Sequence, residues 1–312
     1  MSPAGIPLSI AVAAGSWTMD GIALVLVVLL GSGYARCYGK ARAVEAIGRV
    51  QGWCFSVGLG LWALATLSVI AVYAPVLFWM RALQVLMLLF VVPFFLALGR
   101  PVTTVRAALT DSGRQRLDRL LASRFARLTL APPSTSVVML AVPWLLYLTP
   151  WYVASMTGPV GAVTRVLLVL IGFGYFYARL QSDPVPRRYS PLLSIGISAV
   201  ETLGDGLLGL VLWLGPLIAV QYYAGLHRNW GPSARTDQTV GAGILWILGD
   251  VLGVPFLLVL MRALATHEKV RARDVDTELD RAAEQPADRD DDARPALWWE
   301  ADPQLRERFG RS

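Results

Sequence analysis

The sequence predicts an all-α integral membrane protein, a bundle of about seven transmembrane helices. Of its 312 residues, 55% are hydrophobic and only 16% are charged, and the mean hydropathy is +0.53. Soluble domains usually carry about 25% charged residues. A helix crosses a bilayer core of about 30 Å with about 20 apolar residues, and runs of that length recur along this chain. These observations exclude an ordinary soluble domain.

Seven apolar runs are long enough to cross a bilayer. They cover residues 17–34, 52–73, 76–98, 136–156, 159–180, 191–223 and 240–265. The sixth run is too long for one upright helix. Three alternatives stay open for it: an interfacial helix before Leu203, a bend at Pro216, or a tilt in the bilayer. The seven runs define a membrane bundle over residues 1–265.

Lys and Arg residues are distributed unevenly between alternate loops of this predicted bundle. The loops after the first, third and fifth runs are arginine-rich, whereas the opposite set contains only Arg228 and Arg235. Cytoplasmic loops retain the excess of basic residues, so the N-terminus is predicted outside and the C-terminus in the cytoplasm. The basic rim is expected to meet membrane lipid, and no nucleic-acid role is assigned to it.

The last segment, residues 266–312, has a different composition. It is charged, it contains Pro286 and a run of aspartates, and it is predicted to be a largely disordered cytoplasmic tail. Near its end the adjacent Trp298 and Trp299 stand among charged residues. This end segment either docks on a partner or on the membrane surface, or is a tail that tolerates aromatic residues.

Ionisable residues within the apolar runs are costly in hydrocarbon unless they are paired or hydrated. They are Arg81, Arg165, Glu201, Asp205, Asp250 and Arg262. Arg81 and Arg165 lie at a similar depth from the outer end, roughly 8 to 9 Å at 1.5 Å per residue. We expect both to face the bundle interior and to meet an acid there, with Asp20, Asp237 and Asp250 as candidates.

Glu201 and Asp205 are spaced i, i+4 and therefore share one face of a helix. If that face is buried, the like charges raise one pKa and favour holding a proton. The charged cluster has two readings that the sequence leaves open. It is either a salt-bridge network that fixes helix packing or a ligand or proton site.

Few residues in the sequence suit a metal or a catalytic site. The two histidines, His227 and His267, lie outside the apolar runs, and no nucleophile stands next to a base inside a run, so the chain is not predicted to be an enzyme. Thioethers can hold copper(I), and three methionines fall near predicted outer ends, although ordinary apolar filling explains them as well. These speculative soft ligands are Met19, Met80 and Met156.

Glycines in the sixth run formally match the dinucleotide fingerprint G-x-G-x-x-G. Gly204, Gly206 and Gly209 carry the match. The fingerprint requires a preceding strand and a loop that faces a pyrophosphate, whereas these glycines lie in an apolar helical run. They are therefore predicted to permit close helix packing.

Three stretches of the sequence together resemble a known family. The first contains Gln84, Pro93, Gly99 and Pro101, the second runs from Asp183 and Pro184 to Gly209, and the third contains Trp230, Asp237, Gln238, Gly243 and Trp246. They resemble the CtaG-type cytochrome c oxidase assembly proteins. The resemblance implies a multi-pass protein of the bacterial cell membrane that matures a haem-copper oxidase of the respiratory chain. It also implies copper as a possible cargo and the oxidase catalytic subunit or other assembly factors as partners.

The chain departs from that family at the positions of its intramembrane histidines. The resemblance places Arg81, Val85, Gly161, Arg165 and Asp205 there. Guanidinium groups cannot replace neutral imidazole on copper(I). The resemblance therefore implies a scaffold that grips a nascent subunit, with copper transfer unsupported by these residues. The alternative function is a small-solute or ion transporter or channel, for which a clear internal repeat is missing.

Overall fold

The computed structural model describes residues 5–9, 12, 15–181, 183, 191–248 and isolated positions between 258 and 277, and the regular secondary structure in them is all helical. The chain divides into two units, Met1–Leu264 and Ala265–Ser312. The helices are α2 (Gly21–Ala43), α3 (Arg49–Leu67), α4 (Val69–Tyr73), α5 (Phe78–Leu86), η2 (Met87–Val91), α6 (Val92–Leu98), α7 (Pro101–Ala108), α8 (Asp111–Leu121), α9 (Arg124–Thr129), α10 (Pro132–Leu148), α11 (Trp151–Ala154), α12 (Gly158–Leu180), α13 (Pro191–Leu214), α14 (Val220–Gly225), α15 (Ala234–Gly243) and η3 (Ile244–Leu248).

Four helical stretches in the described part are long and apolar enough to cross a membrane. They are Gly21–Ala43, Arg49–Tyr73, Phe78–Ala108 and Gly158–Leu180, and Pro132–Leu148 is a shorter apolar helix. The third stretch is 67% buried over its most apolar window, against 11% for the first, so the third is central and the first peripheral. The predicted all-helical membrane class is thus confirmed, while the count of seven spans stays a prediction.

Several predicted helix boundaries differ from the structure, as where the run 136–156 divides into α10 and α11, and local chemistry explains two of them. α2 continues to Ala43, nine residues past the predicted end, because Lys40 and Arg42 in its last turn suit the negative end of a helix dipole. α15 begins at Ala234, six residues before the predicted start. Its N-cap is Ser233, whose hydroxyl accepts a bond from the Thr236 N–H at 3.2 Å.

The third run contains Pro93 and stays helical across it. Pro93 has no N–H and therefore interrupts the regular backbone hydrogen bonds of the helix one turn earlier. There η2 forms a π-helical turn between α5 and α6. Gly172 of α12 lies against this turn. A Cβ at Gly172 would collide with the Leu89 carbonyl oxygen and lie 2.6 Å from Pro93 Cγ.

The sixth run breaks close to Pro216, which agrees with the second of the three alternatives. α13 ends at Leu214, the chain turns through Gly215 and Pro216, and Ala219 adopts a left-handed conformation before α14 begins. α13 contacts α10, α15 and η3. A Cβ at Gly209 would lie 2.8 Å from Trp246 Cβ, so this glycine does permit close packing.

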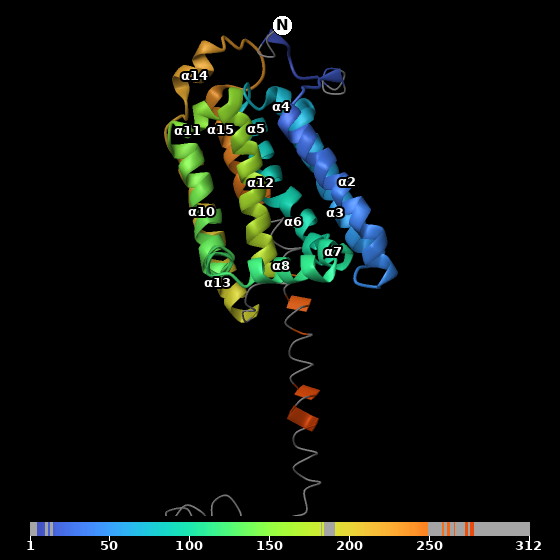
Figure 1. Ribbon diagram of the computed structural model, residues 1–312. Helices are drawn as coiled ribbons and strands as arrows, with labels where there is room; N and C mark the ends of the chain where they lie inside the picture. Colours follow the sequence, from blue (N-terminus) through green and yellow to red (C-terminus); the bar gives the residue numbers. More distant parts are fainter. Residues whose placement is uncertain are drawn as a thin grey trace, which may run out of the picture. The chain divides into compact units, whose positions relative to one another are not determined.

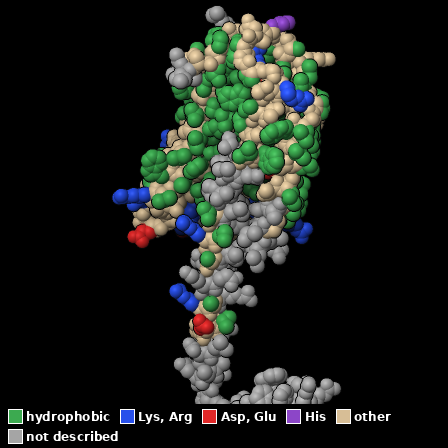
Figure 2. All heavy atoms as spheres, turned by 180° about the vertical axis from the view of Figure 1, so that it is seen from behind, with side chains coloured by type: hydrophobic (Ala, Val, Ile, Leu, Met, Phe, Trp, Pro, Cys, Tyr) green, Lys and Arg blue, Asp and Glu red, His purple; other side chains and the backbone are tan. Residues whose placement is uncertain are grey.

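The arginine-rich segments gather at one end of the bundle. α7 and α8 lie at that end, and α4, α11 and α14 lie at the other (Figure 1). Residues 101–129, predicted as a loop, form α7, α8 and α9, and no residue of α8 or α9 is buried. On the face drawn in Figure 2, hydrophobic side chains cover the middle of the bundle.

Candidate functional site

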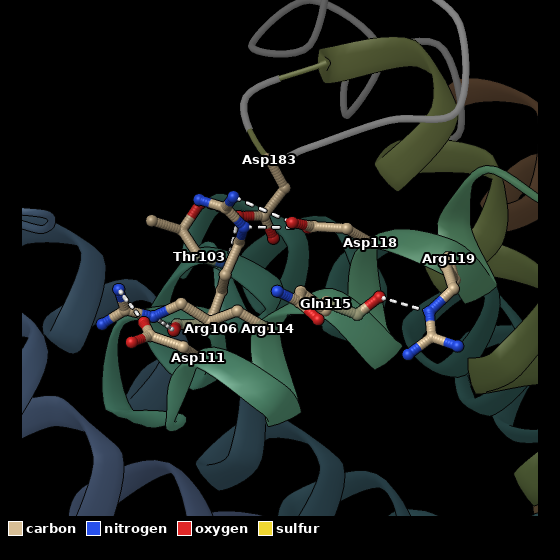
Figure 3. A network of polar contacts seen from close by, with 8 residues as sticks. All are labelled: Thr103, Arg106, Asp111, Arg114, Gln115, Asp118, Arg119 and Asp183. Atoms are coloured by element: carbon tan, nitrogen blue, oxygen red, sulfur yellow. Dashed lines mark hydrogen bonds and ion pairs between the residues drawn. The ribbon is translucent and has the colours of Figure 1, made fainter.

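Two of the family-like stretches meet at the arginine-rich end. The Asp183 carboxylate accepts bonds from the Val102 N–H at 3.1 Å, the Thr103 N–H at 2.9 Å and the Thr103 hydroxyl at 2.6 Å, and so caps α7 (Figure 3). Pro101 is the first residue of this helix, where its missing N–H costs nothing. Burial raises the pKa of Asp183, and its bonds to Thr103 and Val102 oppose that rise.

α7 and α8 are joined by a second contact beside this cap. Arg106 donates to both carboxylate oxygens of Asp118, at 2.9 and 3.0 Å (Figure 3). The hydrogen bond from Arg106 lowers the pKa of Asp118. Both side chains are about half exposed, so this pair orients the two helices more than it stabilises them.

The third family-like stretch fastens helix ends at the opposite end of the bundle. Asp237 accepts a bond from the Trp79 N–H at 3.0 Å at the start of α5 and pairs with Arg228 at 3.3 Å. Gln238 accepts from the Ile218 N–H at 2.7 Å and donates to the Leu212 carbonyl at 2.8 Å, across the break after α13. Asp237 thus pairs with Arg228 and not with an intramembrane arginine.

Arg81 lies at the centre of a buried polar cluster near the same end. Its side chain is 1% exposed. It donates to the Gln84 side-chain oxygen at 2.8 Å and to the Ser155 hydroxyl at 2.7 Å. The Tyr152 hydroxyl lies 2.7 Å from that of Tyr223, and the two tyrosines close the cluster on one side.

The expected acidic partner of Arg81 is missing from the described part of the chain. Its hydrogen-bond acceptors there are all neutral, and its Nε and the nearby Tyr147 hydroxyl are buried without a hydrogen-bond partner. A buried guanidinium without a carboxylate is costly in an apolar interior. Within the described residues, the cluster therefore contains a buried guanidinium that no carboxylate neutralises.

Arg165 does meet an acid, as expected. It pairs with Asp20 at 2.7 Å through both Nε and Nη2, and Asp20 in turn caps α2 by accepting from the Ala23 N–H at 3.1 Å. A Cβ at Gly161 would lie 2.8 Å from the Ser155 carbonyl oxygen and 3.3 Å from Arg165 Nη1. Ser155, the C-cap of α11, thus bonds to Arg81 and lies close to the first turn of α12.

Four of the five positions at which the resemblance places histidines converge in this region. Arg81 and Val85 stand one turn apart on α5, and Gly161 and Arg165 one turn apart on α12. Asp205 is half-buried on α13, one turn from Glu201. The relatives' site positions are thus mostly brought together, with arginine chemistry in place of imidazole chemistry.

Glu201 belongs to a separate buried pair that the sequence reasoning missed. Arg179, fully buried at the end of α12, lies 3.1 Å from the Glu201 carboxylate and 3.0 Å from the Ser136 hydroxyl, and Tyr175 donates to Glu201 at 2.7 Å. The sequence did indicate this residue, because Arg179 is a charged residue within the apolar run 159–180. This pair makes Glu201 one member of a buried salt bridge with Arg179.

The residues in this region do not match a copper(I) site. No group of three His, Cys, Asp or Glu residues that could hold a metal is found in the described ranges. Met80 and Met156 are buried in the hydrophobic core, whereas Met19 is 82% exposed.

Among the remaining predicted site residues, Trp230 packs edge-on against Tyr73, with ring centroids 5.9 Å apart. Gly243 has open space beside it.

Several predictions fall outside the described residues. They concern Asp250, Pro184, the predicted seventh run beyond Leu248, and most of the tail with Trp298 and Trp299.

The fold and the site together define a multi-helix membrane protein whose polar residues fasten helix ends and enclose buried arginines. Residues 32–267 match the family described as the cytochrome c oxidase caa3 assembly factor, Caa3_CtaG. The chain belongs to this family, which confirms the resemblance inferred from the three stretches.

The curated relatives are longer proteins. The chain is 23% identical over 261 residues to an uncharacterized protein of Mycobacterium leprae, an alignment that covers 80% of this chain and 39% of the relative. It is 26% identical over 280 residues to uncharacterized proteins of Mycobacterium bovis and Mycobacterium tuberculosis, covering 86% of this chain and 42% of each. The chain thus spans about two fifths of these relatives. No solved structure matches it.

Proposed function

We propose that the chain is an assembly factor for a respiratory haem-copper oxidase and acts as a membrane scaffold, not as an enzyme. The family match over residues 32–267 carries this proposal. This family is described as an assembly factor of a cytochrome c oxidase, which fits the polytopic helical bundle and its fastened helix ends. The comparisons give no support to the transporter alternative.

The proposed setting is the bacterial cell membrane, with seven spans, the N-terminus outside and the C-terminus in the cytoplasm. Supporting this, the arginine-rich α7 and α8 lie at one end of the bundle and would face the cytoplasm. The Arg81 cluster would then lie in the outer half of the membrane. The proposed partners are the oxidase catalytic subunit and other assembly factors.

The proposed scaffold works without holding copper at the family's histidine positions. Among the described residues, Asp20 pairs with Arg165 and no carboxylate pairs with Arg81, so the described part of this region has surplus positive charge. Such a site favours a negatively charged group, or a strong hydrogen-bond acceptor, of a partner helix, and it repels a copper cation. Copper, as cargo, would have to be delivered to the oxidase by another protein.

The test is a deletion strain whose oxidase is followed from transcript to assembled enzyme. Transcript levels of the oxidase genes should be normal, while the haem a band of isolated membranes should fall, and the full-length gene should restore it. A normal haem a band in the deletion strain would contradict the proposal. A strain with reduced oxidase transcripts would also contradict it, since the defect would then precede assembly.

A further inference from the structure

A groove of about 590 Å³ runs between α2 and α3 at the arginine-rich end of the bundle. Its floor is aromatic: Tyr34 stacks on Phe55 with ring centroids 3.9 Å apart. The Tyr34 hydroxyl is fixed by a bond to the Gly99 carbonyl at 2.8 Å. Gly52 lets Tyr38 lie directly on α3, because a Cβ there would be 2.6 Å from the Tyr38 ring. The groove is therefore a shaped feature with a rigid floor.

The length of the groove matches one leaflet of a bilayer. It extends along α2 from Arg42 to Gly31 and along α3 from Arg49 to Leu59. At 1.5 Å per residue these distances are about 16 and 15 Å. Half of a bilayer core of about 30 Å is about 15 Å. One end of the groove thus reaches the headgroup level while the other reaches the middle of the membrane.

The two ends differ in chemistry. Arg42 and Arg49 line the headgroup end, both are exposed, and neither has an ion-pair partner among the described residues. The carboxylate of Glu45, in the loop between the two helices, does not line the groove. At the other end the walls are Gly31 and Leu59. The groove therefore offers positive charge at the membrane surface and apolar walls below it.

We propose that this groove binds one anionic phospholipid of the leaflet at the arginine-rich end. The phosphate would lie between Arg42 and Arg49, and an acyl chain would run along the stacked aromatic floor toward Leu59. Basic pockets between transmembrane helices on the cytoplasmic side are suited to such headgroups. Trp53, which is 73% exposed and lines the groove, is placed at the depth where tryptophan anchors to the interface.

The experiment measures lipid retention by native mass spectrometry on the full-length chain. The purified protein is incubated with phosphatidylglycerol, phosphatidylcholine or inorganic phosphate. We expect one retained phosphatidylglycerol, and no retention of phosphatidylcholine or phosphate. The double variant Arg42→Gln/Arg49→Gln should weaken phosphatidylglycerol binding by about tenfold or more, since each basic residue near the surface contributes about 1 kcal/mol. Ser56→Trp fills the groove without changing the charge and should also abolish retention.

The matched control is Arg36→Gln/Lys40→Gln, which removes the same charge from the same end of α2 without touching the groove lining. It should change binding less than twofold. Equal weakening by the two double variants would show diffuse surface attraction and overturn the site. So would equal retention of phosphatidylcholine and phosphatidylglycerol, or retention of inorganic phosphate alone. Brominated phosphatidylglycerol should quench tryptophan fluorescence of the unmodified protein more than brominated phosphatidylcholine, and equal quenching would also contradict the proposal.

Discussion

At the scale of single residues, two buried arginines of this bundle have different surroundings. Arg179 meets the Glu201 carboxylate at 3.1 Å, whereas the acceptors of Arg81 in the described part of the chain are neutral groups of Gln84 and Ser155. Removing one member of a buried pair leaves the other charge unpaired, and removing an unpaired charge relieves its desolvation cost. The same substitution should therefore have different effects at the two positions.

Arg179→Met should destabilise the protein by about 3 to 5 kcal/mol, because it leaves the buried Glu201 carboxylate without its cation. The measurement is the thermal unfolding midpoint of the full-length chain in detergent. The control is Arg179→Met/Glu201→Leu, which removes both charges and should recover most of the loss. A double variant as unstable as the single one would show that the pair does not account for the effect.

Arg81→Met should leave the free energy of unfolding within about 2 kcal/mol of the original protein. The loss of charge-assisted hydrogen bonds to Gln84 and Ser155, at about 1.5 to 3 kcal/mol each, is largely offset by removal of a buried guanidinium that meets no carboxylate among the described residues. The same detergent melt checks it, beside Arg165→Met, which strands Asp20 and should lower the midpoint further. A larger loss at Arg81 than at Arg165 would indicate a carboxylate near Arg81 after all.

The burial of Arg81 could be predicted from the sequence, but most of the hydrogen-bond and ion-pair partners of the buried residues could not. Burial of Arg81 follows from its place in an apolar run, but its neutral acceptors come from α5 itself and from the distant α11. Asp20 was foreseen as a partner of an intramembrane arginine, and it meets Arg165. Arg179 was overlooked because it lies close to the predicted end of its run.

At the scale of elements, the family-like residues lie mainly where helices begin, break or end. Asp183 caps α7, Asp237 binds the start of α5, and Gln238 bridges the break after α13. Backbone groups freed at such breaks cannot bond to lipid, so side chains of the bundle must satisfy them. These residues therefore preserve the irregular backbone of the fold.

Gly172→Ala should strongly destabilise the bundle. The added Cβ would collide with the Leu89 carbonyl in the π-helical turn, so α12 and the central helix would have to separate. The matched control is Gly174→Ala on the same helix, where the nearest side-chain atom is Leu130 Cδ2 at 4.0 Å. We expect a much lower melting midpoint for Gly172→Ala only. Equal midpoints would mean that the close contact is not maintained.

The lengths of the apolar runs predicted where most of the long helices lie, but not the residues at which these helices begin and end. The existence of α12 follows directly from a 22-residue apolar run, predicted at 159–180 and found at Gly158–Leu180. The π-helical turn before Pro93 was not predicted, because a proline inside a helix interrupts the hydrogen bonds there without determining whether a kink, a break or a π-helical turn results. The short helices α7 to α9 were missed since their polar sequence carries no membrane signal.

At the scale of the whole molecule, the proposed topology makes a direct prediction. Reporter fusions after Tyr73, Met156 and Gly231 should report an outside location, and fusions after Arg49, Gly113 and Arg188 a cytoplasmic one. The arginine-rich loops are the reason, because cytoplasmic loops retain the basic excess. Any two reversed fusions would be incompatible with the seven-span arrangement.

Family membership and the missing histidines together lead to one expectation about copper. If the chain assembles an oxidase without carrying copper at the Arg81 and Arg165 positions, extra copper cannot replace it. The haem a band of membranes from the deletion strain, grown with and without added copper, measures this. We predict a reduced band that added copper leaves unchanged and that the full-length gene restores. Full restoration by copper alone would contradict this, and would indicate that soft ligands such as Met19, Met80 and Met156 carry the metal.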